Sequence, residues 1–184
     1  MAHFELQPNE SELQQLAEQA WEKAGYREHV LEKMAYEAGE SIRKGDFSLA
    51  NLEAIVSWKS EWEVQYLIGN SKSEIERVLG IVAAPETSLR KAVEALTSLR
   101  GIDLAMASVI LSCIYPDRYA ELDYRVLEAL GHSRHNAEFY AEYVEFCRHL
   151  AEKGLVQPQA GLPGPAPMHT LDRALSEWSR THMA

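Results

Sequence analysis

Two short apolar runs in the middle of the chain are separated only by a short turn that contains Gly101, Ile102 and Asp103. In both runs the apolar residues recur three and four positions apart, which is the spacing of one face of an α-helix. Glycine adopts positive φ without a side-chain clash, and aspartate is a favoured helix N-cap. The stretch therefore predicts two short helices joined by a tight turn. The inward positions are Leu89, Val93, Leu96 and Leu99 in the first run and Leu104, Ala107, Ser108, Ile110 and Leu111 in the second.

The rest of the chain has the same helical spacing, and no segment alternates for long enough to predict a strand. Glycines and capping residues mark the ends of the runs; Ser71 and Glu74, for example, have the spacing of a capping box. We expect an all-α fold of about eight or nine helices. In the run 26–43, the predicted buried stripe consists of Val30, Leu31, Met34, Ala35, Ala38 and Ile42.

The helical runs predict one domain, residues 1–156, with the two-helix hairpin at about 87–115. Residues 157–168 contain four prolines and predict a loop, because proline has no N–H to continue a helix. Residues 169–184 form a last amphipathic run, and we expect this helix to pack back on the domain. Its apolar stripe is Leu171, Ala174, Leu175 and Trp178.

The formal net charge is −10 at pH 7, and residues 1–71 hold 13 acidic and 6 basic side chains. Affinity for a polyanion comes mainly from Lys and Arg side chains that meet phosphates, so this balance argues against nonspecific nucleic-acid binding. The charge instead makes a basic protein a candidate partner for the acidic N-terminal helices, through Glu28, Glu32 and Glu37.

The longest uncharged apolar run, residues 104–116, is too short to cross a bilayer, and the first residues lack a basic start followed by an apolar core. We therefore expect no membrane partner and a cytoplasmic location. Cys113 and Cys147 lie in helical runs at no spacing typical of zinc sites, which predicts buried thiols. No metal and no cofactor are expected.

One constellation resembles the helix-hairpin-helix superfamily of DNA glycosylases. The hairpin is followed by a proline and a tyrosine, and Asp123 then opens the next helical run. The similarity is close over residues 96–131 and looser over about 26–155. The residues that carry it are Leu96, Leu99, Gly101, Ile102, Ala107, Ile110, Leu111, Pro116, Tyr119, Asp123, Arg125, Val126 and Leu130.

The resemblance implies that the hairpin grips the backbone of double-stranded DNA beside a flipped-out nucleotide, with Asp123 facing its sugar. A helix N-terminus offers unpaired N–H groups and a favourable dipole to a phosphate. A carboxylate beside the sugar stabilises the positive charge that develops when the N-glycosidic bond breaks. The expected DNA contacts are Gly101, Ile102, Asp103, Ala105, Arg118 and Arg125.

Two departures from the family pattern qualify this expectation. Relatives that attack the sugar with a lysine carry it at the position of Ala105, so the resemblance implies a monofunctional enzyme that uses water. Asp103 replaces the usual second glycine and puts an anion near the expected phosphate. Asp103 and Asp123 are also good N-caps, with the amide of Arg125 or Val126 as the donor to Asp123.

Aromatic residues near these motifs are candidates for a base-binding pocket, because nucleobases stack on such rings. We expect Trp58, Lys59 and Tyr124 to line it, although rings at helical spacing are also typical of a core. The sequence thus predicts a DNA glycosylase-like base-excision protein. A non-catalytic helix-hairpin-helix module that binds nucleic acid or protein is the alternative.

Overall fold

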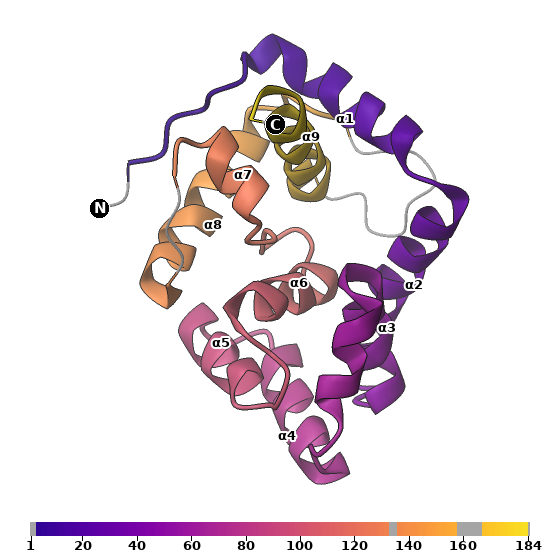
Figure 1. Cartoon of the computed structure of the whole chain (residues 1–184). Helices are drawn as coiled ribbons and strands as arrows, with labels where there is room; N and C mark the ends of the chain where they lie inside the picture. Colours follow the sequence, from indigo (N-terminus) through magenta and orange to yellow (C-terminus); the bar gives the residue numbers. More distant parts are fainter. Residues whose placement is uncertain (1–2, 133–135, 158–166, 184) are drawn as a thin grey trace. The chain divides into compact units, whose positions relative to one another are not determined.

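The computed structural model describes residues 3–132, 136–157 and 167–183 (Figure 1). Over these residues the chain forms nine α-helices and two 3₁₀ helices, without a strand, which confirms the all-α expectation and the approximate number of helices. The elements are η1 (Glu10–Glu12), α1 (Leu13–Lys23), α2 (Tyr26–Arg43), α3 (Leu49–Lys59), η2 (Glu61–Leu67), α4 (Lys72–Ala83), α5 (Leu89–Thr97), α6 (Leu104–Ile114), α7 (Tyr124–Ala129), α8 (Ala137–Glu152) and α9 (Pro167–His182).

Local capping explains where several helices begin. The Ser71 side chain accepts a hydrogen bond from the amide of Glu74, and the Glu74 carboxylate accepts one from the amide of Ser71, so the predicted capping box of α4 is confirmed. Ser88 caps α5 by accepting from the amide of Lys91. The first helical run starts as the single 3₁₀ turn η1 after Asn9 and then continues as α1.

The chain divides into two compact units, each with its own internal packing. The first unit comprises residues 1–25 and 116–184, and the second comprises residues 26–115. These units cut across the expected ranges 1–156 and 169–184, because α9 shares a unit with α1 and with the chain from residue 116 onward. Most of the loop expected at 157–168, residues 158–166, lies outside the described residues.

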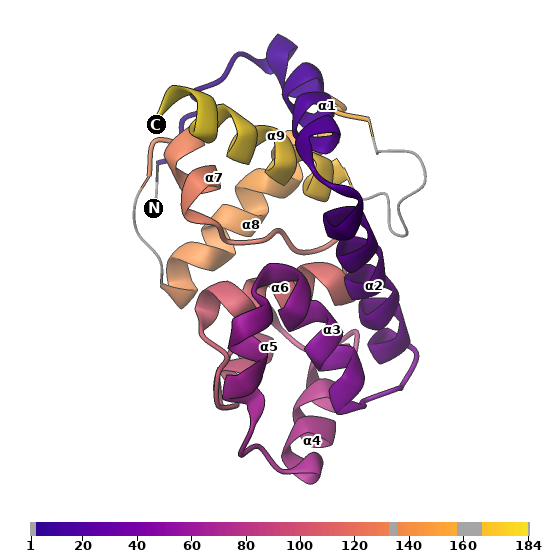
Figure 2. The ribbon, with the colours of Figure 1, turned by 45° about the vertical axis from the view of Figure 1, so that its right-hand side comes forward.

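In the second unit, α2 and α3 lie side by side and both pack against α6 (Figure 2). The expected buried stripe of α2 is partly wrong, since Val30 and Met34 are 37% and 48% exposed. Gly39 is buried instead, and a Cβ added to it would lie 2.1 Å from the carbonyl oxygen of Cys113 in α6. The two backbones approach so closely at this point that no side chain larger than that of glycine fits at position 39.

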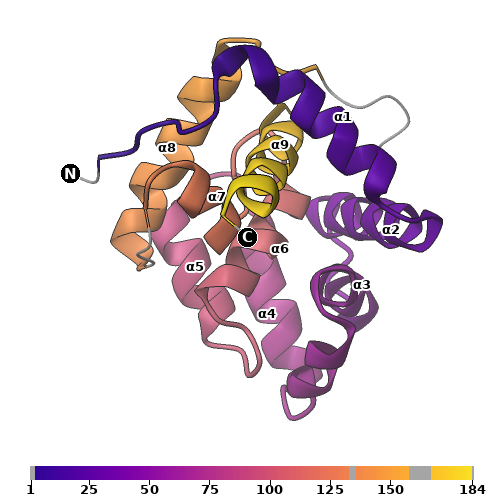
Figure 3. The ribbon, with the colours of Figure 1, turned by 45° about the horizontal axis from the view of Figure 1, so that its top comes forward.

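In the first unit, α9 lies against both α1 and α7 and also contacts α8 (Figure 3). The helix begins at Pro167, a residue that suits the first helical turn because its missing N–H needs no partner there. Leu171, Ala174 and Leu175 are fully buried. The predicted apolar stripe is therefore the face by which α9 packs, with Trp178 half-buried at its end.

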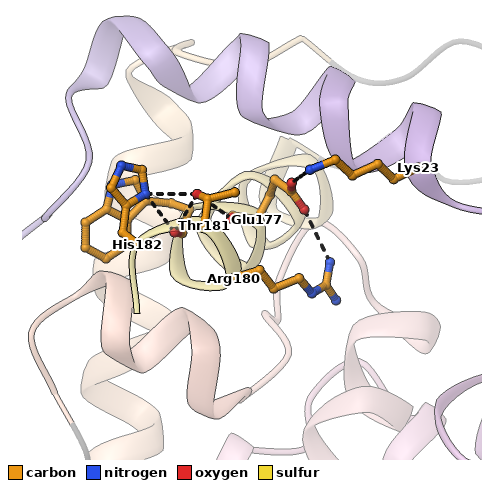
Figure 4. Close-up of polar contacts among 6 residues, drawn as sticks. Lys23, Glu177, Arg180, Thr181 and His182 are labelled. Atoms are coloured by element: carbon orange, nitrogen blue, oxygen red, sulfur yellow. Dashed lines mark hydrogen bonds and ion pairs between the residues drawn. The ribbon is translucent and has the colours of Figure 1, made fainter. Parts of the chain in front are cut away.

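A polar contact accompanies this apolar packing. The carboxylate of Glu177 is almost completely buried and forms ion pairs with Lys23 of α1 and, at 3.6 Å, with Arg180 (Figure 4). Trp178 and His182 stack with their ring centroids 4.8 Å apart. Of these contacts, the ion pair of Glu177 with Lys23 links α9 to α1, and the other two lie within α9. Among the described helices, none is both long enough and apolar enough to span a membrane.

Candidate functional site

The predicted hairpin is formed by α5 and α6, and its turn depends on Gly101. This residue has φ = +82°, a conformation that side chains other than glycine rarely adopt. A Cβ at Gly101 would also lie 2.7 Å from the Cβ of Tyr66 and 2.8 Å from its carbonyl carbon. Ile102, the next residue, is buried. The turn therefore requires glycine both for its backbone conformation and for the space beside η2.

Asn70, a residue that the sequence analysis did not single out, holds this turn in place. Its Oδ1 accepts a hydrogen bond from the amide of Arg100 at 2.8 Å, and its Nδ2 donates to the carbonyl oxygen of Arg100 at 3.0 Å. Nδ2 also donates to the carbonyl oxygen of Leu67 at 3.0 Å. One amide side chain thus bridges the hairpin turn and the end of η2. Only the Gly69-Asn70 pair in the sequence, typical of a loop, marks this position.

Asp103 is the N-cap of α6. Its Oδ1 accepts a hydrogen bond from the amide of Met106 at 2.8 Å, and the residue is exposed. Helix geometry leaves the first amides of α6 without intrahelical acceptors, and the carboxylate satisfies one of them. Ala105 is half-buried in the first turn and supplies no amine. The capping role weighed for Asp103 is therefore present.

Asp123 is the N-cap of α7, and its Oδ1 accepts a hydrogen bond from the amide of Arg125 at 2.8 Å. The residue is half-buried. The capping role weighed for Asp123 is thus present as well. A carboxylate has two oxygens and can accept several hydrogen bonds, so capping does not exhaust what this group can do chemically.

The two arginines expected to meet DNA each lie over the ring of a neighbouring tyrosine. The Arg118 guanidinium is 5.3 Å from the centroid of Tyr119, and the Arg125 guanidinium is 5.0 Å from the centroid of Tyr124. Both arginines are half-buried, whereas Tyr124 is 54% exposed. Stacking on a ring restricts a guanidinium to few orientations and leaves its charge in place.

The other expected pocket residues, Trp58 and Lys59, lie in the last turn of α3. The ring of Trp58 is half-buried and packs 5.7 Å from the ring of Tyr36 in α2, which is the packing of a core aromatic. Lys59 is exposed.

The expected residues fall into two sets. The hairpin residues, Trp58 and Lys59 belong to the second unit, and Arg118, Asp123, Tyr124 and Arg125 belong to the first.

A set of buried polar side chains packs against the segment that leads to Asp123. Tyr140, Tyr143 and Cys147 of α8 are fully buried, and burial raises the pKa of each well above its usual value. The nearby carboxylate of Asp172 in α9 raises the pKa of all three further. All three groups are protonated at neutral pH, and the hydroxyls of Tyr140 and Tyr143 act as hydrogen-bond donors. Of these residues the sequence predicted only the burial of the Cys147 thiol, which is confirmed.

Two pockets of the second unit lie away from the expected site residues. One, of about 670 Å³, is lined by residues that include Asp46, Asn70, Lys72 and Glu76. The other, of about 500 Å³, lies beside α4 and the start of α5. Within the described part of the chain, no three His, Cys, Asp or Glu side chains are arranged to hold a metal ion.

One expectation about a partner surface is wrong in part. Glu28 and Glu37 are exposed on α2, but Glu32 is only 4% exposed and cannot present its charge to a basic protein.

Comparison of the chain with protein families, with curated proteins and with solved structures finds no match.

Proposed function

We propose that this protein is a DNA glycosylase-like base-excision protein of the helix-hairpin-helix type, which hydrolyses the N-glycosidic bond of a flipped-out base with Asp123 and water. The observation that carries the proposal is the α5–α6 hairpin itself. Its Gly101 turn has positive φ, and the α6 N-terminus follows within three residues. Such a turn brings backbone N–H groups to a surface where a phosphate can be bound without regard to sequence.

Asp123 has the chemistry that base release requires. Bond cleavage leaves positive charge on the deoxyribose, and an ionised carboxylate stabilises that charge and orients water. The capping bond from Arg125 keeps the carboxylate in one orientation. The stacked Arg118 and Arg125 place two cations in the same unit as Asp123, where they can meet the phosphates of a bound strand.

The test is base release from duplexes that carry common lesions or modified bases, with Asp123→Asn as the variant. Asparagine caps a helix as well as aspartate does, so this change removes the charge and keeps the cap. We expect a loss of at least a hundredfold in the single-turnover rate of base release, on the order of the effect of one charge-stabilising group. Asp117→Asn, an exposed neighbour in the same unit, is the matched control. Absence of base release from every duplex in the parent protein would reject the catalytic proposal.

Because position 105 has no lysine, the proposal can be tested by a second measurement. Without an amine nucleophile no Schiff base forms with the sugar. We therefore expect borohydride to trap no covalent complex with substrate DNA, and the product to be an intact abasic strand. A trapped adduct would show that another lysine attacks the sugar and that the water mechanism is wrong.

A non-catalytic nucleic-acid-binding module is the second candidate. The observation that favours it is that Asp103 and Asp123 both already serve as helix caps. In that case binding is salt-dependent, no base is released, and Arg118→Glu with Arg125→Glu abolishes binding. Failure to bind DNA even at low salt would remove both candidates and leave a protein partner for the exposed acids of α2.

A further inference from the structure

Side chains of other helices form hydrogen bonds with peptide groups of the segment between α6 and α7. Residues 119–122 form no regular structure, yet all four are buried. Buried peptide groups outside helices need other partners, because an unsatisfied N–H or C=O is costly. For Ala120 and Glu121 the partners are side chains of α8 and α9. The segment ends at Asp123, so whatever holds it also fixes the backbone position from which the Asp123 side chain extends.

Two tyrosines of α8 supply the first part of this support. Tyr140 donates its hydroxyl proton to the carbonyl oxygen of Ala120 at 2.9 Å, and Tyr143 donates to that of Glu121 at 2.8 Å. The tyrosines are three residues apart, so they lie on one face of the helix, and their rings stack at 6.3 Å. Both rings are fully buried, which fixes their rotamers.

Helix α9 supplies the second part through Asp172. Its Oδ2 accepts a hydrogen bond from the amide of Glu121 at 3.2 Å, and the residue is only 6% exposed. Glu121 is therefore held at both of its peptide groups, by α9 at the N–H and by α8 at the C=O. Arg148 of α8 adds a bond to the carbonyl oxygen of Arg118 at 3.0 Å. Four side chains from two helices thus fix the backbone leading to Asp123.

A residue that only caps a helix does not need this support. Ser88 caps α5, and of the three residues before it only Thr87 is buried, with its hydroxyl donating to the carbonyl oxygen of Ile81 at 2.6 Å. Chemical groups that must be held within a fraction of an ångström of a reacting atom do need rigid backing. We propose that Tyr140, Tyr143 and Asp172 are positioning residues that fix the backbone before Asp123 and thereby orient its carboxylate. This inference rests on the proposed function, because it assigns the support a catalytic purpose.

The test compares two buried tyrosines whose hydroxyls donate to different backbone carbonyl groups. Tyr143→Phe removes the bond to Glu121, whereas Tyr115→Phe removes a similar buried bond, from the Tyr115 hydroxyl to the carbonyl oxygen of Ala83 at 2.5 Å in the other unit. For each variant we would measure thermal unfolding, the single-turnover rate and KM of base release, and hydrogen exchange of the Arg125 amide. That amide donates to Asp123 and so reports the orientation of its carboxylate.

We expect Tyr143→Phe to slow the single-turnover rate about ten- to a hundredfold with KM nearly unchanged, as displacement of a reacting group does. Arg125 amide exchange should rise about tenfold in the same variant. Tyr115→Phe should change neither quantity, although both variants lower the melting temperature. Equal effects of the two variants on rate and on exchange would overturn the proposal.

Two further outcomes remain decisive. If the parent protein releases no base, the proposed function fails, and the exchange of the Arg125 amide alone decides whether Tyr143 orients Asp123. If Tyr143→Phe does not fold, Tyr140→Phe replaces it, since its hydroxyl holds the preceding carbonyl. Unchanged Arg125 exchange in Tyr140→Phe would then reject the positioning role.

Discussion

At the scale of single residues, Asp103 carries a charge whose effect on DNA binding can be separated from its structural role. Asp103→Asn keeps an N-cap for the amide of Met106 and removes the anion beside the hairpin turn. If the hairpin binds phosphate, we expect the dissociation constant for duplex DNA at low salt to fall about fivefold, the effect of about 1 kcal/mol of repulsion. Fluorescence anisotropy would measure it.

The control for Asp103 is Glu22→Gln, which makes the same change in charge on α1. A similar gain in affinity from both variants would mean that only net charge matters and that the hairpin has no special part in binding. Unchanged affinity in Asp103→Asn would argue against phosphate contact at this turn.

Gly101 is the residue on which the hairpin turn depends. Gly101→Ala brings a Cβ to within 2.9 Å of three atoms of Tyr66 and strains a backbone with positive φ. Gly154→Ala has a similar φ, +68°, but nothing within 4 Å of the added Cβ. We expect Gly101→Ala to lower the free energy of unfolding by about 1–3 kcal/mol more than Gly154→Ala does, which urea denaturation would measure. Equal losses would show that η2 moves away at little cost.

At the scale of elements, the buried carboxylate of Glu177 links α9 to α1 through its ion pair with Lys23 (Figure 4). Glu177→Gln keeps the shape of the side chain but loses the charge that Lys23 and Arg180 contact. We expect the free energy of unfolding to fall by about 1–3 kcal/mol, because bonds to a buried charged group are stronger than neutral ones.

The matched control is Glu94→Gln, which breaks an exposed ion pair with Arg90 within α5. Solvent screens such a pair, so its loss should lie within the error of the measurement. Chemical denaturation of both variants would test the contrast. A loss in Glu177→Gln no larger than that in Glu94→Gln would mean that apolar packing alone holds α9 in place.

At the scale of the whole molecule, we expect three buried weak acids of the first unit to make the free energy of unfolding fall as the pH becomes alkaline. The pKa values of Cys147, Tyr140 and Tyr143 are raised in the folded state, so the folded protein keeps protons that the unfolded chain loses. Their contribution to the free energy of unfolding is fully present at pH values below the ordinary pKa, which is 9.0 for the thiol and 10.0 for the hydroxyls. It is lost as the pH rises above these values.

We therefore expect the free energy of unfolding to begin to fall near pH 9 and to fall more steeply above pH 10, by about 1.4 kcal/mol per pH unit for each group. Urea titrations at a series of pH values would measure this. Replacement of Trp58 and Trp62 by Phe leaves Trp21 and Trp178 as reporters of the first unit. Stability that stays constant to pH 11 would contradict the expected effect of burial.

The amino-acid sequence by itself determined the elements and their caps. The capping box at Ser71, the cap at Asp103 and the cap at Asp123 follow from residues two or three positions apart, and so does the helical spacing that predicted an all-α fold. Such interactions are local and are visible in the order of residues. The left-handed turn at Gly101 belongs with them, because few other residues take that conformation.

Only the tertiary structure decided the features that join residues far apart. The close contact of Gly39 with Cys113 rotates the buried face of α2 away from Val30 and Met34, and Asn70 closes the hairpin turn from another loop. The support of the backbone before Asp123 by α8 and α9 is of the same kind. Each depends on which helix faces which, a choice that the periodicity of one segment does not contain because any apolar face can pack against several others.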